Sequence, residues 1–254
     1  MSKVTVVKLG GSVITRKEKP LTVDERTLKR LCGELAASGK RRLIVIHGGG
    51  SFGHHIVHDL HLLPPSRSAS RIGLARVVKG MDDLSNSVID AMIDSGLPGV
   101  VFPTFAVATS KNAQIKNLFL KSILMALEMD LIPVMRGDLC CDEETGYNVV
   151  SGDMVAEALA QKIGVDKVIM CIDRDGLESG GRVLPVVRMG DRSYENLIWK
   201  SETVDVTGGM LHKLEALRPL ARIGVKLLLI NGRKAGRLLA ALRGKQTVGT
   251  ELRW

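Results

Sequence analysis

The sequence predicts an α/β protein: a three-layer αβα sandwich around a mostly parallel open sheet. Short β-branched runs alternate with longer amphipathic stretches along the 254 residues. The short runs are almost entirely apolar, which is typical of parallel strands that helices cover on both faces. Glycines cluster where these runs end, and this is the edge at which α/β sheets bind ligands.

Each strand is predicted from an apolar, β-branched run that ends at a turn. The first run, KVTVVKLGG, ends in two glycines. In chain order, we expect strands over 3–11, 42–47, 99–105, 131–139, 167–176 and 225–232. Each helix is predicted from apolar residues at helical spacing, and the first helix is closed by Gly39. We expect helices over 23–39, 77–96, 115–130, 153–164 and 210–224.

The alternation of strands and helices continues across residues 160–170 without a linker or a repeat. Residues 1–254 are therefore predicted to form a single domain. Any division within it should give two lobes, 1–165 and 166–254, that share one continuous sheet.

The composition favours a cytoplasmic protein in which most basic residues form a solvated surface and a minority lie in a substrate site. The net charge is +9, but the basic residues are dispersed, and aromatic residues make up only 3% of the chain. Stacking platforms for nucleic acid are therefore scarce. No apolar run reaches membrane-spanning length, so we expect no membrane partner. The cysteines lack the spacing of a zinc site and are predicted to be reduced thiols: Cys32, Cys140, Cys141 and Cys171.

The segment HGGGSFGH contains a G-x-G-x-x-G pattern, formed by Gly48, Gly50 and Gly53. A dinucleotide fold also needs an acidic residue about 20 positions later, at the end of the next strand. That region reads SRSASRIG, with no carboxylate, so we reject this interpretation. A Walker A loop is absent as well, because SGKRR near residue 40 lacks its other required residues.

The glycines could still let backbone N–H groups approach an anion, with His54 as a charged donor beside it. A tight strand-to-helix turn is the alternative. Three further clusters lie at predicted strand ends or helix starts: KLGGS with Lys17 after it, SGDM, and DVTGGM with Lys213 after it. Four such loops in one sheet favour a site for several phosphates.

Taken together, these motifs resemble the amino acid kinase superfamily, and within it the isopentenyl phosphate kinases. KLGGSVIT, HGGGSFGH, RSASRIG, VVSGD, DRDG and DVTGGM occur in the order of that family and cover essentially the whole chain. His54, which closes the second motif, marks the branch whose acceptor is a phosphate monoester. The resemblance implies the amino acid kinase fold, a homodimer, and transfer of the γ-phosphoryl group of ATP to isopentenyl phosphate.

The resemblance also implies roles for individual residues. The first lobe would bind the acceptor and the second lobe ATP, with Mg²⁺ held mainly by the ATP phosphates rather than by protein ligands. The catalytic residues would be Lys8, Lys17, His54, Asp153 and Lys213. The acceptor phosphate would meet Gly49, His54, Ser151 and Gly152. ATP would meet Lys8, Gly10, Gly11, Ser12, Gly50, Asp173, Asp175, Gly176, Gly208, Gly209 and Lys213.

The acceptor tail is expected to meet apolar side chains. Candidates lie on the helix after RIG and just before SGD: Leu74, Val77, Val78, Met81, Val149 and Val150. A helical apolar stripe also forms core in many proteins, and that alternative stays open. Arg136 stands where the family commonly has an aromatic residue, and we interpret it as a surface cation or an extra phosphate contact.

Phosphoryl transfer depends on positioning and charge neutralisation, and a phosphate acceptor needs no general base. The lysines and His54 suit that task. Two alternatives remain. The same scaffold could act on another small monophosphate or phosphonate such as fosfomycin. A non-catalytic nucleotide-binding regulator would be favoured by loss of Lys8 or Lys17, but both are present.

Overall fold

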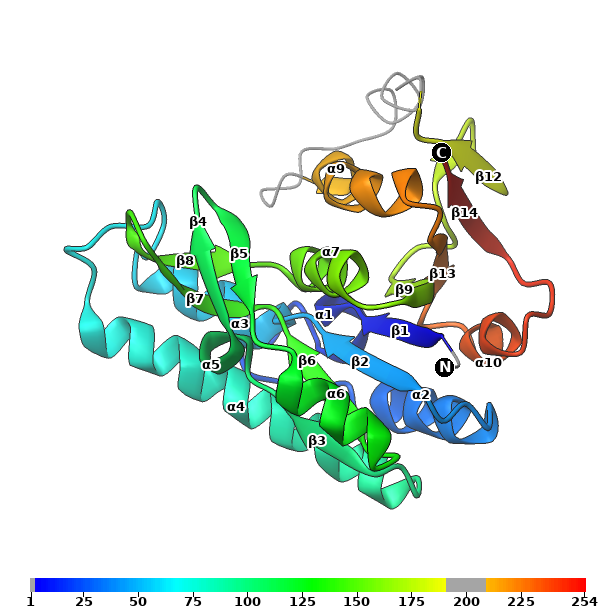
Figure 1. Ribbon diagram of the computed structural model, residues 1–254, viewed down its shortest axis with the longest axis horizontal. Coiled ribbons are helices and arrows are strands. Elements are labelled where there is room, and N and C mark those ends of the chain that lie inside the picture. The colour runs from blue at the N-terminus through cyan, green and yellow to red at the C-terminus, as the bar shows by residue number, and fades with distance from the viewer. Residues whose placement is uncertain (1–2, 191–208) are drawn as a thin grey trace.

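The computed structural model describes residues 3–190 and 209–254, except for the side chains of residue 54 and residues 209–213. Its centre is an eight-stranded sheet in the order β12-β14-β13-β9-β1-β2-β6-β3 (Figure 1). Every neighbouring pair is parallel except β13 and β14. These strands are β1 (Val4–Leu9), β2 (Leu43–His47), β3 (Gly99–Val101), β6 (Ile132–Arg136), β9 (Val165–Ile172), β12 (Val186–Arg188), β13 (Lys226–Asn231) and β14 (Gly249–Arg253).

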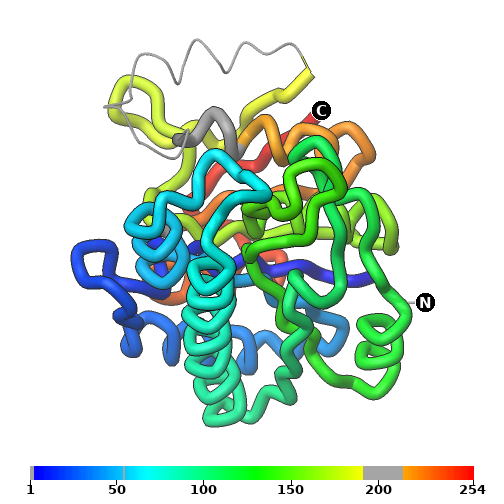
Figure 2. Tube along the Cα trace, turned by 90° about the vertical axis from the view of Figure 1, so that its left-hand side faces the viewer, coloured from blue at the N-terminus to red at the C-terminus, as the bar shows by residue number. Residues whose placement is uncertain are grey.

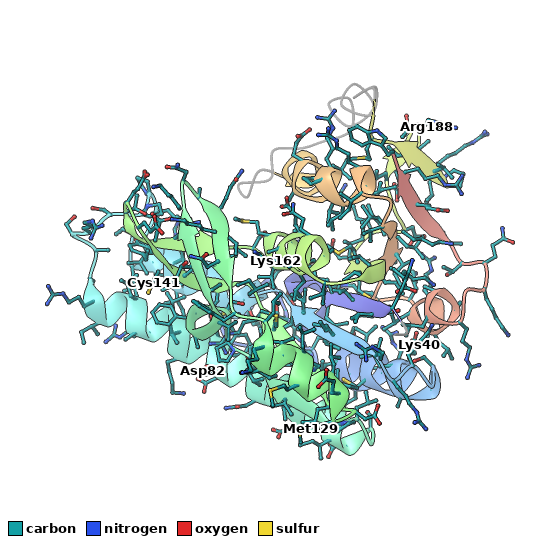
Figure 3. All side chains as sticks on the ribbon, viewed as in Figure 1. Lys40, Asp82, Met129, Cys141, Lys162 and Arg188 are labelled. Atoms are coloured by element: carbon teal, nitrogen blue, oxygen red, sulfur yellow. The ribbon has the colours of Figure 1, made fainter. Side chains whose placement is uncertain are left out.

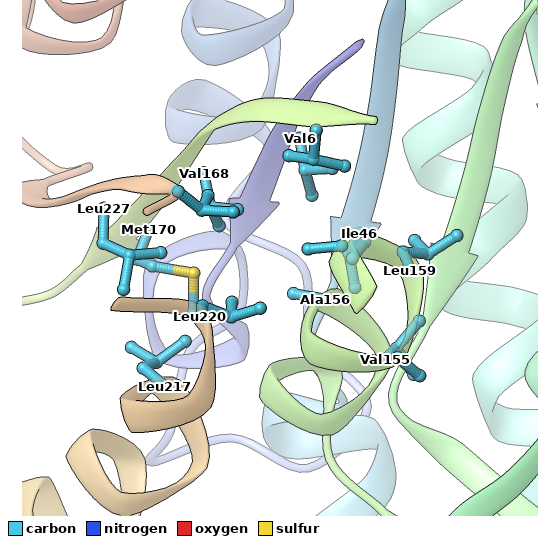
Figure 4. Close-up of a cluster of buried hydrophobic side chains, with 14 of the residues drawn as sticks. Val6, Ile46, Val155, Ala156, Leu159, Val168, Met170, Leu217, Leu220 and Leu227 are labelled. Atoms are coloured by element: carbon cyan, nitrogen blue, oxygen red, sulfur yellow. The ribbon is translucent and has the colours of Figure 1, made fainter. Parts of the chain in front are cut away.

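Helices cover both faces of this sheet. Successive side chains of a strand point to opposite faces, and those of β1 are buried on both. On β1, Val6 packs with one buried cluster and Val7 with the other. The cluster of Val6 includes side chains of α6 (Lys121–Glu128), α7 (Gly152–Lys162) and α9 (Gly209–Arg222), and Figure 4 shows part of it. The cluster of Val7 includes side chains of α2 (Glu25–Ala37), α4 (Arg71–Asp94) and α10 (Arg237–Leu242). The three-layer αβα arrangement predicted from the sequence is confirmed.

A second sheet, in the order β5-β4-β7-β8, lies beside α4 (Figure 2). Its strands are β4 (Ala108–Lys111), β5 (Gln114–Leu118), β7 (Asp138–Asp142) and β8 (Gly146–Val150). The helix predicted over 115–130 is therefore wrong in its first part, because β5 forms there and α6 begins at Lys121. Asn112 and Ala113 have φ angles of 51° and 59°, which suit a two-residue hairpin turn between β4 and β5. The sequence analysis missed this turn and therefore the hairpin that it forms.

Short elements connect the strands. They are α1 (Gly11–Ile14), α3 (Gly50–Asp59), α5 (Thr104–Val107) and the hairpin of β10 (Glu178–Ser179) with β11 (Arg182–Val183). The strand predicted over 99–105 ends at Val101, before α5, and the one predicted over 131–139 divides at Gly137 into β6 and β7. Strands from both sides of residue 165 join the large sheet. Among the helices that the structure describes, none is long and apolar enough to cross a membrane.

Candidate active site

Two glycine loops meet at the carboxyl ends of the neighbouring strands β1 and β2. A methyl group added to Gly11 would lie 2.2 Å from the backbone nitrogen of Gly50, and one added to Gly48 would lie 2.6 Å from the nitrogen of Gly11. Gly50 also has a φ of +49°, which favours glycine. The glycines are therefore required for the two loops to pack backbone against backbone, at the edge where an α/β sheet binds ligands.

Lys8 lies just before the first of these loops and forms a buried ion pair with Asp153. Its Nζ is 2.6 Å from Oδ1 of Asp153, and the two side chains are 8% and 9% exposed. Asp153 is in the first turn of α7, whose N-cap is Ser151. A methyl group on Gly152 would lie 3.2 Å from Cε of Lys8, so the lysine side chain crosses the start of α7. The structure thus brings three predicted residues, Asp153, Ser151 and Gly152, beside Lys8.

Lys17 forms an ion pair with Asp173. The sequence analysis expected both residues at the site but did not predict that they contact each other. Nζ of Lys17 lies 3.1 Å from Oδ2 of Asp173, and the lysine side chain is 61% exposed. Burial raises the pKa of Asp173, but the hydrogen bond and charge of Lys17 outweigh it and hold that pKa below its usual value. The pair joins the segment after α1 to the segment after β9, and the lysine side chain stays largely exposed to solvent.

Asp175 and Gly176 have partners within the protein. The carboxylate of Asp175 accepts hydrogen bonds from Arg237, at 2.9 and 3.2 Å, and from Nδ2 of Asn231, at 2.7 Å. Gly176 has a φ of +151°, and a methyl group there would lie 2.6 Å from Oγ1 of Thr250. These contacts fix the turn after β9. The role of both residues beside a nucleotide stays a prediction.

Most of the apolar residues proposed for the acceptor tail lie together. Leu74, Val77, Val78 and Val149 belong to one small cluster between α4 and the second sheet. Met81, one turn further along α4, has its sulfur 3.3 Å from the position that a methyl group on Gly49 would take. Val150 differs, because it packs in the main core with α7. Contact of this cluster with a substrate stays a prediction.

Arg136 is not a surface cation, contrary to one of the two interpretations from the sequence. Its side chain is fully buried, and Nε lies 2.7 Å from Oδ2 of Asp138. Its Nη1 contacts both Asp82, on α4 (Figure 3), and Oγ of Ser85, each at 2.8 Å. The second interpretation, an extra phosphate contact, stays a prediction: carboxylates hold Nε and Nη1, whereas Nη2 is buried without a hydrogen-bond partner among the described residues. Asp138, two residues after Arg136 in the sequence, is the feature that could have indicated a buried ion pair.

His47 belongs to the same buried network and was missed by the sequence analysis. Its Nε2 lies 2.9 Å from Oγ of Ser85, and its backbone oxygen accepts from the nitrogen of Gly137. Burial and the charge of Arg136 lower the pKa of His47 to about 3, so the ring is neutral near pH 7. Gly48 follows His47 directly, so the hydrogen bonds of His47 fix the start of the second glycine loop.

Several predicted residues lie wholly or partly outside the described residues. His54 is on α3 and Lys213 on α9, but their side chains are outside the description, and Gly208 is outside it altogether. Gly209 begins α9. Ser12 is partly buried, and its carbonyl oxygen accepts from Arg233 at 2.7 Å. Within the described part of the chain, no three His, Cys, Asp or Glu side chains are placed to hold a metal ion.

Comparison with known proteins now adds to this geometry. The amino acid kinase family model matches residues 3–231. An isopentenyl phosphate kinase from Methanothermobacter thermautotrophicus is 30% identical, over 97% of this chain and 98% of the relative. One from Haloferax volcanii is 34% identical, over 85% of this chain and 88% of the relative. A solved isopentenyl phosphate kinase structure superposes with a TM-score of 0.85 at 27% identity, covering 98% of this chain and 99% of the other.

The chain therefore belongs to the amino acid kinase family, a family of phosphotransferases. The resemblance to isopentenyl phosphate kinase, expected from the order of the motifs, is confirmed by relatives that match nearly its full length.

Proposed function

We propose that the protein transfers the γ-phosphoryl group of ATP to isopentenyl phosphate, giving isopentenyl diphosphate and ADP. The observation that carries the proposal is the meeting of the two glycine loops beside the Lys8–Asp153 pair. Backbone N–H groups there can approach phosphate oxygens closely, while the lysine neutralises negative charge between them. Relatives of nearly equal length carry the name of this activity.

The reaction needs positioning and charge neutralisation more than proton transfer. The acceptor phosphate already carries a nucleophilic oxygen, so its attack on the γ-phosphorus requires no general base. Lys8 and Lys17 would lie between the donor and acceptor phosphates, and Gly10 and Gly11 would donate N–H groups to the transferred phosphoryl group. Asp153 orients Lys8 through the 2.6 Å ion pair. Lys213 would stabilise the charge that develops on ADP.

The acceptor would bind in the first lobe, residues 1–165. His54 and Gly49 would hold its phosphate, with Ser151 and Gly152 closing from the start of α7. Its apolar tail would extend toward Met81 and the cluster of Leu74, Val77 and Val149. ATP would bind in the second lobe, residues 166–254. The remaining nucleotide contacts would come from Ser12, Gly50, Asp173, Asp175, Gly176, Gly208 and Gly209.

Mg²⁺ would reach the site with ATP. It is commonly bound through substrate phosphates and one or two carboxylates, rather than by a cage of protein ligands. The ATP phosphates would supply most of its ligands, and the partly exposed carboxylate of Asp173, beside Lys17, is of the type that can add to them. When bound, the ion would neutralise the β- and γ-phosphate oxygens.

We also propose a homodimer in the cytoplasm. At the β3 edge of the large sheet, apolar side chains are exposed on β3 and on or next to α4 and α6: Ile93, Val100, Met125 and Met129. An open sheet edge flanked by apolar surface favours pairing with a second copy. Light scattering should give twice the chain mass, and Val100→Glu should shift it toward a monomer. The free cysteines suit a reducing compartment.

The test is an ADP-release assay with Mg-ATP and isopentenyl phosphate, dimethylallyl phosphate, fosfomycin, acetylglutamate or no acceptor. Strong turnover with isopentenyl phosphate is expected, and His54→Ala should reduce use of the acceptor by about 10²–10³-fold while changing the KM for ATP little. Turnover with fosfomycin alone would replace the substrate but keep the mechanism. Silence with every acceptor would contradict the proposed activity.

A further inference from the structure

A cavity lined by arginines lies outside the residues assigned to catalysis. It has a volume of about 450 Å³ and opens between the start of α2 and the segment after β13. Four of its lining residues are arginines, accompanied by one acid and one hydroxyl side chain: Arg16, Arg26, Arg30, Arg233, Asp24 and Thr27. Four guanidinium groups against one carboxylate give the cavity a strong excess of positive charge.

The neighbouring carboxylates neutralise this charge only in part. Asp24 is the N-cap of α2, and its side chain accepts from the backbone nitrogen of Thr27 at 3.1 Å. Glu34 pairs with Arg30 at 2.6 Å, and Arg30 also donates to the carbonyl oxygen of Gly232. Arg30 is thereby fixed in place at the wall of the cavity.

Arg16 and Arg26 differ from Arg30. Both are exposed, and neither side chain has a hydrogen bond or ion pair with any side chain or backbone group that the structure describes. Arginine side chains that converge on one cavity without partners repel one another. An anion between them would remove that repulsion and accept charge-assisted hydrogen bonds.

Arg233 connects the cavity to the candidate active site. Its guanidinium group donates to the carbonyl oxygen of Ser12 at 2.7 Å, and Ser12 directly follows the glycines of the first loop. The cavity is nevertheless separate, because none of the residues proposed to bind ATP or the acceptor lines it.

We propose that this arginine cavity is a second anion site, which binds a phosphate or diphosphate group apart from the phosphates that react. One guanidinium group can donate two hydrogen bonds to two oxygens of the same phosphate. A cavity of this volume suits a small phosphorylated ligand. The site does not depend on the identity of the acceptor. An anion bound in the cavity would lie beside Arg233, whose guanidinium group donates to the carbonyl oxygen of Ser12 in the first glycine loop.

The test measures binding of inorganic pyrophosphate by calorimetry with a non-hydrolysable ATP analogue at saturation. We compare the wild-type protein with Arg16→Ala/Arg26→Ala, and with Lys40→Ala/Arg41→Ala as a control that removes the same charge near the amino end of β2, where both side chains are exposed. The first variant should lose one pyrophosphate site or weaken it about tenfold or more, whereas the control should match the wild type.

Further arms identify the source of the group. Inorganic phosphate, isopentenyl diphosphate and ADP are titrated in the same way, and the ligand that shows the largest difference between wild type and Arg16→Ala/Arg26→Ala is the preferred occupant. Equal binding of every ligand to both proteins would overturn the proposal. A raised KM for ATP in this variant would also overturn it, because the cavity would then belong to the donor site. Melting temperatures confirm that both variants fold.

Discussion

The ammonium group of Lys8 lies 2.6 Å from the carboxylate of Asp153, although 145 positions separate the two residues in the chain. The pair joins the end of β1 to the first turn of α7, and both side chains are almost completely buried. A buried pair of this kind fixes the position of an ammonium group that would otherwise be mobile. It therefore connects the stability of the fold with the geometry of the site.

Removing one member of this pair should reduce both stability and activity. Lys8→Met leaves a buried carboxylate without its lysine, and we expect a loss of about 3–5 kcal/mol in the free energy of unfolding. The double variant Lys8→Met/Asp153→Leu removes both charges and should recover much of that stability, but not turnover. Urea denaturation and ADP release measure the two effects. A double variant that regains activity would contradict the role of Lys8 in phosphoryl transfer.

Because the two glycine loops are in contact, alanine substitutions at Gly11 and at Gly33 should have different effects on turnover. In Gly11→Ala the new methyl group would lie 2.2 Å from a backbone nitrogen, so the loops must separate, and turnover should fall by about a hundredfold or more. Gly33→Ala is the control, because Gly33 lies within α2 and has no atom within 4 Å of the new methyl group. It should stabilise the protein by about 0.5–1 kcal/mol and leave activity unchanged. Equal activity of the two variants would show that the close approach is unimportant.

The buried His47 predicts a pH dependence of stability. Burial lowers its pKa to about 3 from an ordinary value of 6.5, so the unfolded chain binds the extra proton between these values. The free energy of unfolding should therefore fall as the pH decreases from 6.5 toward 3, by up to about 1.4 kcal/mol per pH unit from this residue. His47→Asn should make the curve flatter between pH 7 and 5. His58→Gln, at an exposed site, should leave the slope unchanged.

The four cysteines should differ sharply in reactivity. Burial raises the pKa of Cys32 and Cys171 to about 12 and that of Cys140 to about 11, so these thiols stay protonated near neutral pH. Cys141 is exposed on β7 (Figure 3). Iodoacetamide should label one thiol per native chain, at Cys141, and none in Cys141→Ser, as read by mass spectrometry. Rapid labelling of Cys171 in the native protein would contradict the described packing.

The amino-acid sequence was sufficient for properties that arise within short segments. The alternation of strands and helices and the glycines at strand ends are local backbone features, so they predicted the sheet and its two helical layers, and they indicated the edge at which the candidate site lies. The hairpin of β4 and β5 was missed because IKNLF has an apolar pattern that continues into the following helix. The positive φ angles of Asn112 and Ala113 form the turn that precedes β5.

The tertiary structure decided the pairings. β1 lies between β2 and β9, and this order brings Lys17 to Asp173 and the glycine loops into contact. Arg136 became a buried ion-pair partner because Asp82 and Asp138 converge on it from α4 and β7. The arginine cavity likewise combines residues from α2 and from the segment after β13. Such contacts depend on which distant elements become neighbours, and local periodicity contains no information about that choice.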